Sequence, residues 1–355
     1  MAKQVVGLKI GASRLTAARL AVNGSAELLQ LAESPLPQGV IAGGEVREVA
    51  ALAEAMKEFF KRHKLPKRNV RIGVANNRIG VRTIEVAGIE DPKQLANAVR
   101  FRAQEALPIP IDEAVLDFQV LSESQNAEGQ HVRRVLLVVA YRDLIAAYTE
   151  ACRLAGVRLA GVDLEAFALL RALTPAGPPP APGTDRSALV AVSVGSQRSV
   201  LAVSDGTSCD FTRILDWGGN ALTVAIGRAL EVELDEAELL KIELALQGDA
   251  VPDGMAPQRA VQAREALVGA LQAFGRELVS SLQFYQGQPD SLGIREIVLA
   301  GGTARLAGLA SELQRLVGVP VRVGDPLVGV AVGKKLRGDA PGPSHAVSIG
   351  LGMAV

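Results

Sequence analysis

The residues VVGLKIGAS at positions 5–13 open this sequence with a short apolar run that ends in small residues. The first six of them predict a strand, and the last three predict a turn. A second strand-like run at 15–22 leads into Asn23-Gly24, a pair that readily takes the positive φ values of a type I′ hairpin turn. The sequence therefore predicts two strands joined by a glycine turn.

A second copy of this layout begins in the middle of the chain, with LVAVSVGSQ at 189–197. A further strand-like run follows at 199–204 and ends at Asp205-Gly206. The repeat is weak in residue identity, but the order of strand, small-residue turn, strand and tight turn is the same. Two related halves are predicted.

A third glycine turn lies late in the second half. Residues 295–299 predict a strand, AGGT at 300–303 a turn, and a helix is expected to start at Ala304. Glycines let a ligand approach the backbone, and the start of a helix offers unpaired N–H groups. Each turn taken singly is ordinary chain geometry. The three together favour a ligand-binding role more than any one of them does.

A proline-rich stretch, TPAGPPPAPGT at 174–184, separates the two copies and favours an extended connection. We therefore place the first half at 1–173, a linker at 174–186 and the second half at 187–355. An inserted α/β subdomain is expected at about 82–156, and a helical subdomain at about 218–288.

The apolar periodicity gives the remaining elements. Helices are predicted near 49–63, 92–106, 143–155, 164–173, 219–230, 235–246, 259–285, 305–317 and 328–337. Further strands are predicted near 70–75, 81–86, 115–121, 133–140, 296–300 and 320–323.

Composition excludes several classes of function. Lys+Arg and Asp+Glu both number 38 and aromatic residues make up 3%, so neither a basic surface nor a stacking platform for nucleic acid is expected. Cys152 and Cys209 lack metal-ligand or disulfide spacing. No uncharged apolar run reaches the ~18–20 residues of a membrane span, and the first residues do not resemble a signal peptide. A cytoplasmic protein without direct membrane insertion is expected.

Several motifs resemble those of a known family. They are ALPIP at 106–110 with VLDF at 115–118, GGNALT at 218–223 with EAELLK at 236–241, SLQFY at 281–285, and VLAGGTARLAGL at 298–309. In this order they resemble the PilM family of type IV pilus assembly proteins, within the actin, Hsp70 and FtsA superfamily. The resemblance covers about the whole chain. It implies an α/β, actin-like fold of duplicated ribonuclease H-like domains.

The resemblance also implies where a nucleotide would bind, through the two phosphate turns, the adenosine turn and a helix of the second half. The candidate cofactor-binding residues are Lys9, Gly11, Ala12, Ser13, Gly195, Ser196, Gln197, Glu238, Lys241, Gly301, Gly302 and Thr303.

The chemistry of the cleft departs from that of actin-like ATPases. Lys9 and Ser193 stand where that superfamily has two aspartates that hold Mg²⁺ through water. Because hard cations need anionic oxygen ligands, we expect no Mg²⁺ and no catalytic residue. Two roles are open for Lys9: it neutralises nucleotide phosphates itself, or it belongs to a vestigial cleft and pairs with a carboxylate or extends to solvent. Thr303, in place of a third glycine, is expected to narrow the adenosine pocket. ATP binding is expected to be weak or absent.

Three functions compete. The first, implied by the resemblance, is a scaffold for pilus or related secretion assembly that binds the N-terminal tail of a PilN-like inner-membrane protein. A pilus motor ATPase and self-association are further candidate partners. The second is an active ATPase or sugar kinase, for which Asp163 and Asp216 are candidates without motif support. The third is a nucleotide-hydrolysing cytoskeletal protein similar to FtsA, which ordinarily carries a C-terminal amphipathic membrane helix that residues 348–355 do not resemble.

The family resemblance implies that the tail docks on the inserted subdomain, against residues 1–81. One predicted helix there carries closely spaced charged and aromatic side chains: Arg100, Phe101, Arg102, Gln104 and Glu105. Two interpretations are open. These residues line a groove for a peptide, or Phe101 belongs to a core and the arginines form a solvated face.

Overall fold

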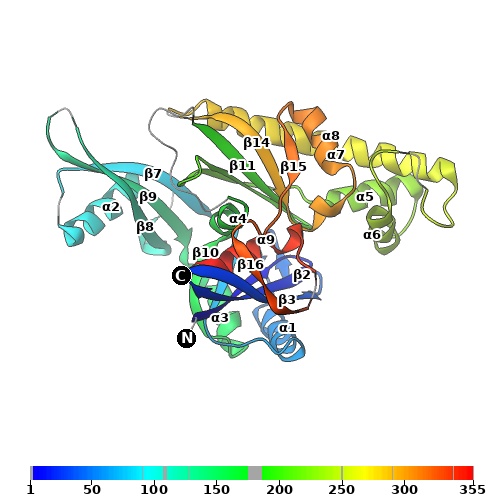
Figure 1. Ribbon diagram of the computed structural model, residues 1–355, viewed down its shortest axis with the longest axis horizontal. Coiled ribbons are helices and arrows are strands. Elements are labelled where there is room, and N and C mark those ends of the chain that lie inside the picture. The colour runs from blue at the N-terminus through cyan, green and yellow to red at the C-terminus, as the bar shows by residue number, and fades with distance from the viewer. Residues whose placement is uncertain are drawn as a thin grey trace.

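The computed structural model describes residues 3–89, 91–106, 110–126, 128–174, 186–248, 251–289, 291–338 and 340–354. Figure 1 shows two lobes, each built around a β-sheet, with a smaller α/β subdomain at one end of the long axis and helices of the second lobe at the other. Most of the predicted linker, 175–185, lies outside the described residues.

The first sheet has six strands in the order β10-β6-β1-β2-β3-β16. β1, β2 and β3 form an antiparallel meander, and β6, β10 and β16 join it in parallel. The bounds are β1 Lys3–Ile10, β2 Arg14–Asn23, β3 Ser25–Pro35, β6 Val70–Val74, β10 Leu159–Leu164 and β16 Val330–Arg337. Helices α1 (Val49–Arg62) and α3 (Arg142–Leu154) pack in its core, together with β-strand side chains.

The second sheet has the order β13-β12-β11-β14-β15. Again three strands form an antiparallel meander and two join it in parallel, so the arrangement β3-β2-β1-β6-β10 of the first sheet is repeated. The bounds are β11 Ser187–Val194, β12 Ser199–Ser204, β13 Cys209–Leu215, β14 Gly293–Ala300 and β15 Val321–Val323. Its helices are α5 Gly219–Leu230, α6 Leu234–Glu243, α7 Pro257–Gln286 and α8 Leu309–Val317. The duplication predicted from the sequence is present in the strand order.

Two helices lie between the sheets, α4 (Glu165–Leu173) and α9 (Ala346–Met353), and they cross in the centre of Figure 1. The two helices cross so closely that a Cβ on Gly350 would lie 1.8 Å from the carbonyl oxygen of Ala168. Buried alanine, valine and leucine side chains of α4, α9, β11 and β12 form one continuous core there. α4 and α9 therefore join the two lobes.

The inserted subdomain is a three-stranded sheet in the order β7-β9-β8, with α2 on one face. Its elements are β7 Ile79–Ala87, α2 Pro92–Ala106, the 3₁₀ segment η1 Ile111–Glu113, β8 Ala114–Gln125 and β9 His131–Tyr141. Its core is separate from that of the first lobe, and α3 belongs to the latter through Leu144, Tyr148 and Cys152. The residues that form this separate core therefore span a shorter stretch of the chain than the range 82–156 predicted for the subdomain.

Three local predictions are wrong. The segment predicted as a helix at 328–337 contains strand β16 instead. Its valines alternate, Gly329 and Gly333 disfavour a helix, and it pairs with β3. The helix expected from Ala304 is a 3₁₀ segment, η2 Gly302–Arg305, and α8 starts only after Gly308, whose φ is 86°. The turn at Asn23-Gly24 is not type I′, since only Gly24 has a positive φ. Strands β3, β10 and β13 and helix α9 were not predicted.

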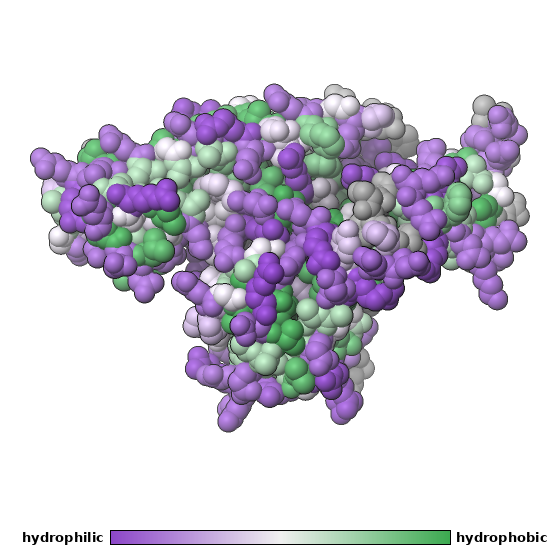
Figure 2. All heavy atoms as spheres, turned by 180° about the vertical axis from the view of Figure 1, so that it is seen from behind, coloured by the Kyte–Doolittle hydropathy of each residue, from purple (hydrophilic) through white to green (hydrophobic). Residues whose placement is uncertain are grey.

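The surface in Figure 2 is mostly hydrophilic, and its hydrophobic residues lie in small separate groups. Within the described ranges, no helix is long and apolar enough to cross a membrane.

Candidate functional site

The second glycine turn is bonded into the start of helix α5. The turn closes through a hydrogen bond from Gly195 N to Arg198 O of 2.9 Å. Gly219 N and Asn220 N donate to the carbonyls of Gly195 and Ser196, both at 2.8 Å. These are among the first N–H groups of α5, which lack partners within the helix. Because the turn satisfies them, they are not available to an anion in this arrangement.

Thr303 fills the space between that turn and α5. Its hydroxyl donates to the carbonyl of Gly195 at 3.2 Å, and a Cβ added to Gly219 would lie 2.5 Å from the same hydroxyl oxygen. Gly301, with φ of 88°, presses so closely on Val194 that a Cβ would meet the Val194 carbonyl at 2.3 Å. Gly302 is exposed beside them. The adenosine turn of the resemblance is thus packed directly on the second phosphate turn.

Glu238 and Lys241 complete this cluster from α6. Lys241 Nζ, in a buried residue, donates to Gly219 O at 3.2 Å, to Thr223 Oγ1 at 2.9 Å and to Glu238 Oε2 at 2.5 Å. Burial alone would raise the pKa of Glu238, but hydrogen bonds from Lys241 and Thr223 hold that pKa below its ordinary value. The ammonium and the carboxylate therefore satisfy each other and the start of α5.

The first glycine turn has fewer neighbours. Gly11 N donates to Arg14 O at 3.0 Å, which closes the turn in the same way as in the second half. Ala12 is half-buried against the core of the first lobe, and Ser13 is exposed. Lys9, in the strand that precedes this turn, contacts the second half through Ser193.

Lys9 meets the second half in a buried polar group. Its Nζ lies 3.3 Å from Glu165 Oε2, at the start of α4, and 3.5 Å from Ser193 Oγ, at the end of β11. The side chains of Lys9 and Glu165 are 15% and 8% exposed. Of the two roles considered for Lys9, the pairing with a carboxylate is the one that the structure contains. Lys9 and Ser193, the two positions that depart from the aspartates, thus face each other.

A cavity of about 680 Å³ lies between the edge of the first lobe and the loop that precedes α9. Its lining residues are Arg14, Glu33, Ser34, Pro35, Arg305, Ala340, Pro341, Gly342 and Pro343. Arg14 pairs with Glu33, and Arg305 donates to Ser344 Oγ at 2.8 Å. The volume lies in the range of small-molecule sites, and two guanidinium groups suit an anionic ligand.

Metal ligands do not gather in this region. In the part of the chain that the structure describes, no group of three or more His, Cys, Asp or Glu side chains is placed to hold a metal ion. Asp163 pairs with Arg171, and Asp216 pairs with Arg198 at 2.8 Å. Both aspartates considered for an enzyme are therefore engaged in ion pairs.

The inserted subdomain carries the second candidate site. Phe101 on α2 is 63% exposed, so the interpretation that placed it in a core is wrong. The charged neighbours on the helix, Arg100, Arg102 and Glu105, are exposed as well, and Arg102 lies 3.3 Å from Glu105. Residues 107–109 of the following motif lie outside the described residues. An exposed aromatic side chain with a charged rim is available to a partner.

A family model for the type IV pilus assembly protein PilM matches residues 7–355. The chain belongs to this family. A solved structure described as a PilM–PilN type IV pilus biogenesis complex contains a chain that is 28% identical to it, with a TM-score of 0.80 and complete coverage of both chains. The family predicted from the sequence is confirmed.

Two further comparisons show how far the similarity of this chain to known proteins extends. Cell division protein FtsA of Pseudomonas aeruginosa is 24% identical over 381 residues, which cover 99% of this chain and 89% of that protein. MreB5 of Spiroplasma citri bound to AMPPNP is 11% identical with a TM-score of 0.57, and the match covers 98% of this chain and 94% of that one. At such identity the structural likeness shows the fold alone. The predicted actin-like fold is confirmed.

For this member of the PilM family, sequence reasoning missed Glu165. It is the acidic residue at the start of the otherwise apolar segment LEAFALL at 164–170, and it is 6% exposed. An acid placed at the start of an apolar helix was the available signal, because a buried carboxylate needs a cationic or hydrogen-bonding partner. Gln197 was assigned to the cofactor, but its side chain accepts a hydrogen bond from Gly43 N at 3.3 Å.

Proposed function

We propose that this chain is a cytoplasmic scaffold of type IV pilus or related secretion assembly, which binds the N-terminal tail of a PilN-like inner-membrane protein. The supporting observation is the end-to-end likeness to a chain of the PilM–PilN complex. It lies at the inner face of the membrane through that partner. Contacts with a pilus motor ATPase and with other copies of the chain belong to the same proposal.

The inserted subdomain is the proposed docking site. It has its own core, and α2 presents Phe101 with charged neighbours to solvent. An exposed aromatic residue is the kind of side chain that dominates the binding energy of an interface once it is covered. The tail would lie between this subdomain and the body formed by residues 1–81.

Fluorescence anisotropy with a labelled peptide, the N-terminal tail of the PilN-like protein encoded in the same genome, tests the docking site. We expect Phe101→Ala to weaken binding by about tenfold or more. Phe284→Ala is the matched control, because Phe284 on α7 is 57% exposed in the other lobe. Equal affinity of both variants and wild type would refute the docking site, and no binding by wild type would refute the function.

Point variants are preferable to a deletion of 82–156. That deletion would remove Leu144, Tyr148 and Cys152 from the core of the first lobe. A loss of binding would then report unfolding as readily as a lost contact.

We further propose that the cleft does not hydrolyse nucleotide. Lys9 carries positive charge where a Mg²⁺ ion would need carboxylates, and Glu165 already neutralises it. Purified protein is expected to release no phosphate from ATP above background. A turnover rate that EDTA abolishes would overturn this part of the proposal.

The substitution pair Lys9→Asp and Ser193→Asp sharpens the test. With Glu165 it would bring three carboxylates together and so provide oxygen ligands for a cation. We expect Mg²⁺ to raise ATP affinity by about tenfold or more in this variant and to leave the wild type unchanged. Calorimetry that finds no Mg²⁺ effect in the variant would show that the lost carboxylates do not explain the cleft.

A further inference from the structure

A two-strand hairpin stands between the second glycine turn and the base of the inserted subdomain. It consists of β4 (Ile41–Ala42) and β5 (Glu45–Val46), joined by Gly43 and Gly44. Both glycines have positive φ, and a Cβ on Gly44 would lie 2.4 Å from the carbonyl of Ala75. The corner of this hairpin is therefore fixed in shape and pressed against the chain that enters the subdomain.

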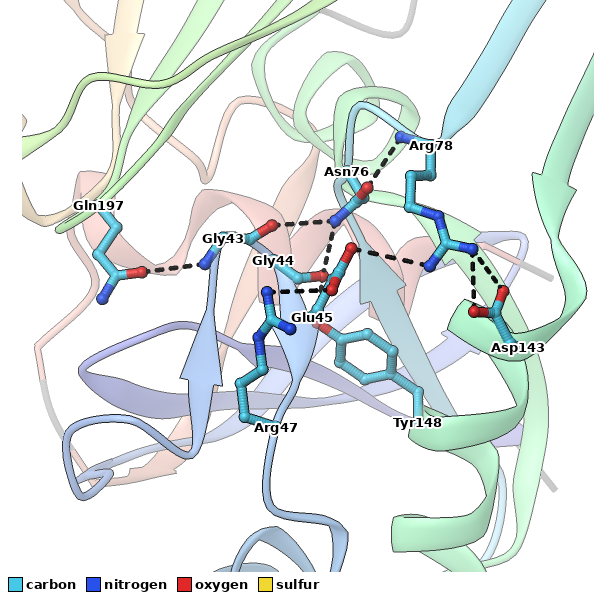
Figure 3. A network of polar contacts seen from close by, with 9 residues as sticks. All are labelled: Gly43, Gly44, Glu45, Arg47, Asn76, Arg78, Asp143, Tyr148 and Gln197. Carbon is cyan, nitrogen blue, oxygen red and sulfur yellow. Dashed lines mark hydrogen bonds and ion pairs between the residues drawn. The ribbon is translucent and has the colours of Figure 1, made fainter. Parts of the chain in front are cut away.

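One side of the hairpin is held by the second half of the molecule. Gln197 Oε1 accepts a hydrogen bond from Gly43 N at 3.3 Å, as Figure 3 shows. The guanidinium group of Arg198 packs on the same corner and pairs with Asp216 at 2.8 Å. Asp216 in turn accepts a hydrogen bond from Asn77 of the first half at 3.3 Å.

The other side is held by the segment that leads into the inserted subdomain and by α3 of the first lobe. Asn76 Nδ2 donates to Gly43 O at 2.9 Å and to Gly44 O at 3.2 Å, and the hydroxyl of Tyr148 donates to Gly44 O at 3.1 Å. Asn76 is 4% exposed and comes directly before the connection into β7.

Arg78 extends this network to the strand that leaves the subdomain. It lies 3.7 Å from Glu45 and donates to Asp143 at 2.7 and 2.9 Å. Its guanidinium carbon also lies 4.4 Å from the ring centroid of Tyr141, the last residue of β9. Figure 3 shows Arg78 between Glu45 and Asp143, beside the glycine corner. Both chain crossings at the base are thus bonded to the hairpin.

We propose that the 41–46 hairpin couples the 195–198 turn to the orientation of the inserted subdomain. A movement of the second lobe that displaces Gln197 and Arg198 removes support from the glycine corner, and Asn76 and Arg78 then lose their fixed partners. The two crossings are the hinge of the subdomain. A second part of this proposal rests on the proposed function. Docking of a tail on the subdomain shifts the interdomain cleft, and a change in the cleft alters tail affinity by the same factor.

Hydrogen–deuterium exchange on the full-length protein tests the coupling without any partner. We expect Gln197→Ala and Asp216→Ala each to raise exchange about threefold or more in peptides that cover 41–46, 76–80 and 139–142. Gln197→Glu keeps an oxygen acceptor at the same place and should behave like wild type. Glu296→Ala is the control, because it breaks an ion pair of 2.6 Å with Arg322 on the second sheet, outside this network.

Exchange that rises only around 195–217, or that rises equally in Glu296→Ala, would overturn the coupling. Peptide anisotropy then tests the linkage: the Gln197→Ala protein should bind the PilN-like tail with an affinity that differs about threefold or more from wild type. Unchanged affinity together with altered exchange would overturn the linkage alone. Failure of wild type to bind the tail would refute the proposed function and leave the exchange result standing.

Discussion

The two glycine turns, each after the first strand of its half, have the same backbone closure and different surroundings. Gly11 N donates to Arg14 O, and Gly195 N donates to Arg198 O, at 3.0 and 2.9 Å. The second turn is also bonded to α5 and Thr303, whereas Arg14 of the first turn borders an open cavity. The comparison teaches that a duplicated hairpin keeps its local geometry while its neighbours decide what it can bind.

The largest expected effect comes from the ion pair between Lys9 of β1 and Glu165 of α4. Glu165→Ala leaves the buried ammonium of Lys9 without its carboxylate, and removing one partner of a buried pair destabilises by about 3–5 kcal/mol. Urea denaturation measures this as a lowered midpoint with an unchanged slope.

Two variants make this result specific. Glu54→Ala removes an exposed pair with Lys57 on α1 and should change the unfolding free energy by less than about 1 kcal/mol. Replacing both buried partners together, Lys9→Met with Glu165→Leu, should recover most of the loss. Comparable small effects for Glu165→Ala and Glu54→Ala would mean that the Lys9–Glu165 pair stabilises the fold no more than an exposed pair does.

The second turn gives the next largest effect. In Gly219→Ala the new methyl group would lie 2.5 Å from Thr303 Oγ1, so we expect a loss of about 1–3 kcal/mol from overpacking. Thr303→Ala removes that oxygen and the bond to Gly195, and alone should lose about 1 kcal/mol. The double variant should be more stable than Gly219→Ala, because the clash is gone. Additive losses in a double-mutant cycle would show that Thr303 does not fill this space.

A substitution in the first turn should lower stability much less. A Cβ on Gly11 would lie 3.1 Å from the Arg14 carbonyl, and the φ of Gly11 is not positive. Gly11→Ala is therefore expected to cost less than about 1 kcal/mol. Thermal unfolding of Gly11→Ala beside Gly219→Ala checks the contrast between the turns. A larger loss at Gly11 would reverse it.

These contrasts also show which features the sequence could predict. Each glycine hairpin was predictable because its signals, alternating apolar residues and a small-residue turn, lie next to each other in the chain. Strand β16 was mistaken for a helix because its pairing with β3 is made in three dimensions. Glu165 was missed for the same reason, since Lys9 reaches it from a strand far away in sequence. Local geometry was accessible from the sequence, and the partners that fill the cleft were not.

The smallest expected effect is a pH dependence of stability that arises from Glu238 in the second half. The pKa of Glu238 is lowered despite its burial, because Lys241 and Thr223 donate hydrogen bonds to the carboxylate. A folded-state pKa below the unfolded value means that this carboxylate stabilises the fold above the unfolded pKa, and that the contribution is lost as pH falls through the folded pKa. Glu238→Gln should therefore be less stable than wild type at neutral pH, and the difference should shrink below about pH 4.5. Urea denaturation from pH 7 to pH 3 measures it, with Thr223→Val as a background in which one of the two hydrogen bonds is missing and the pH effect should be smaller. If the difference in unfolding free energy between wild type and Glu238→Gln stays constant with pH, the carboxylate does not act through its charge. The second turn would then be supported by α5 and Thr303 alone.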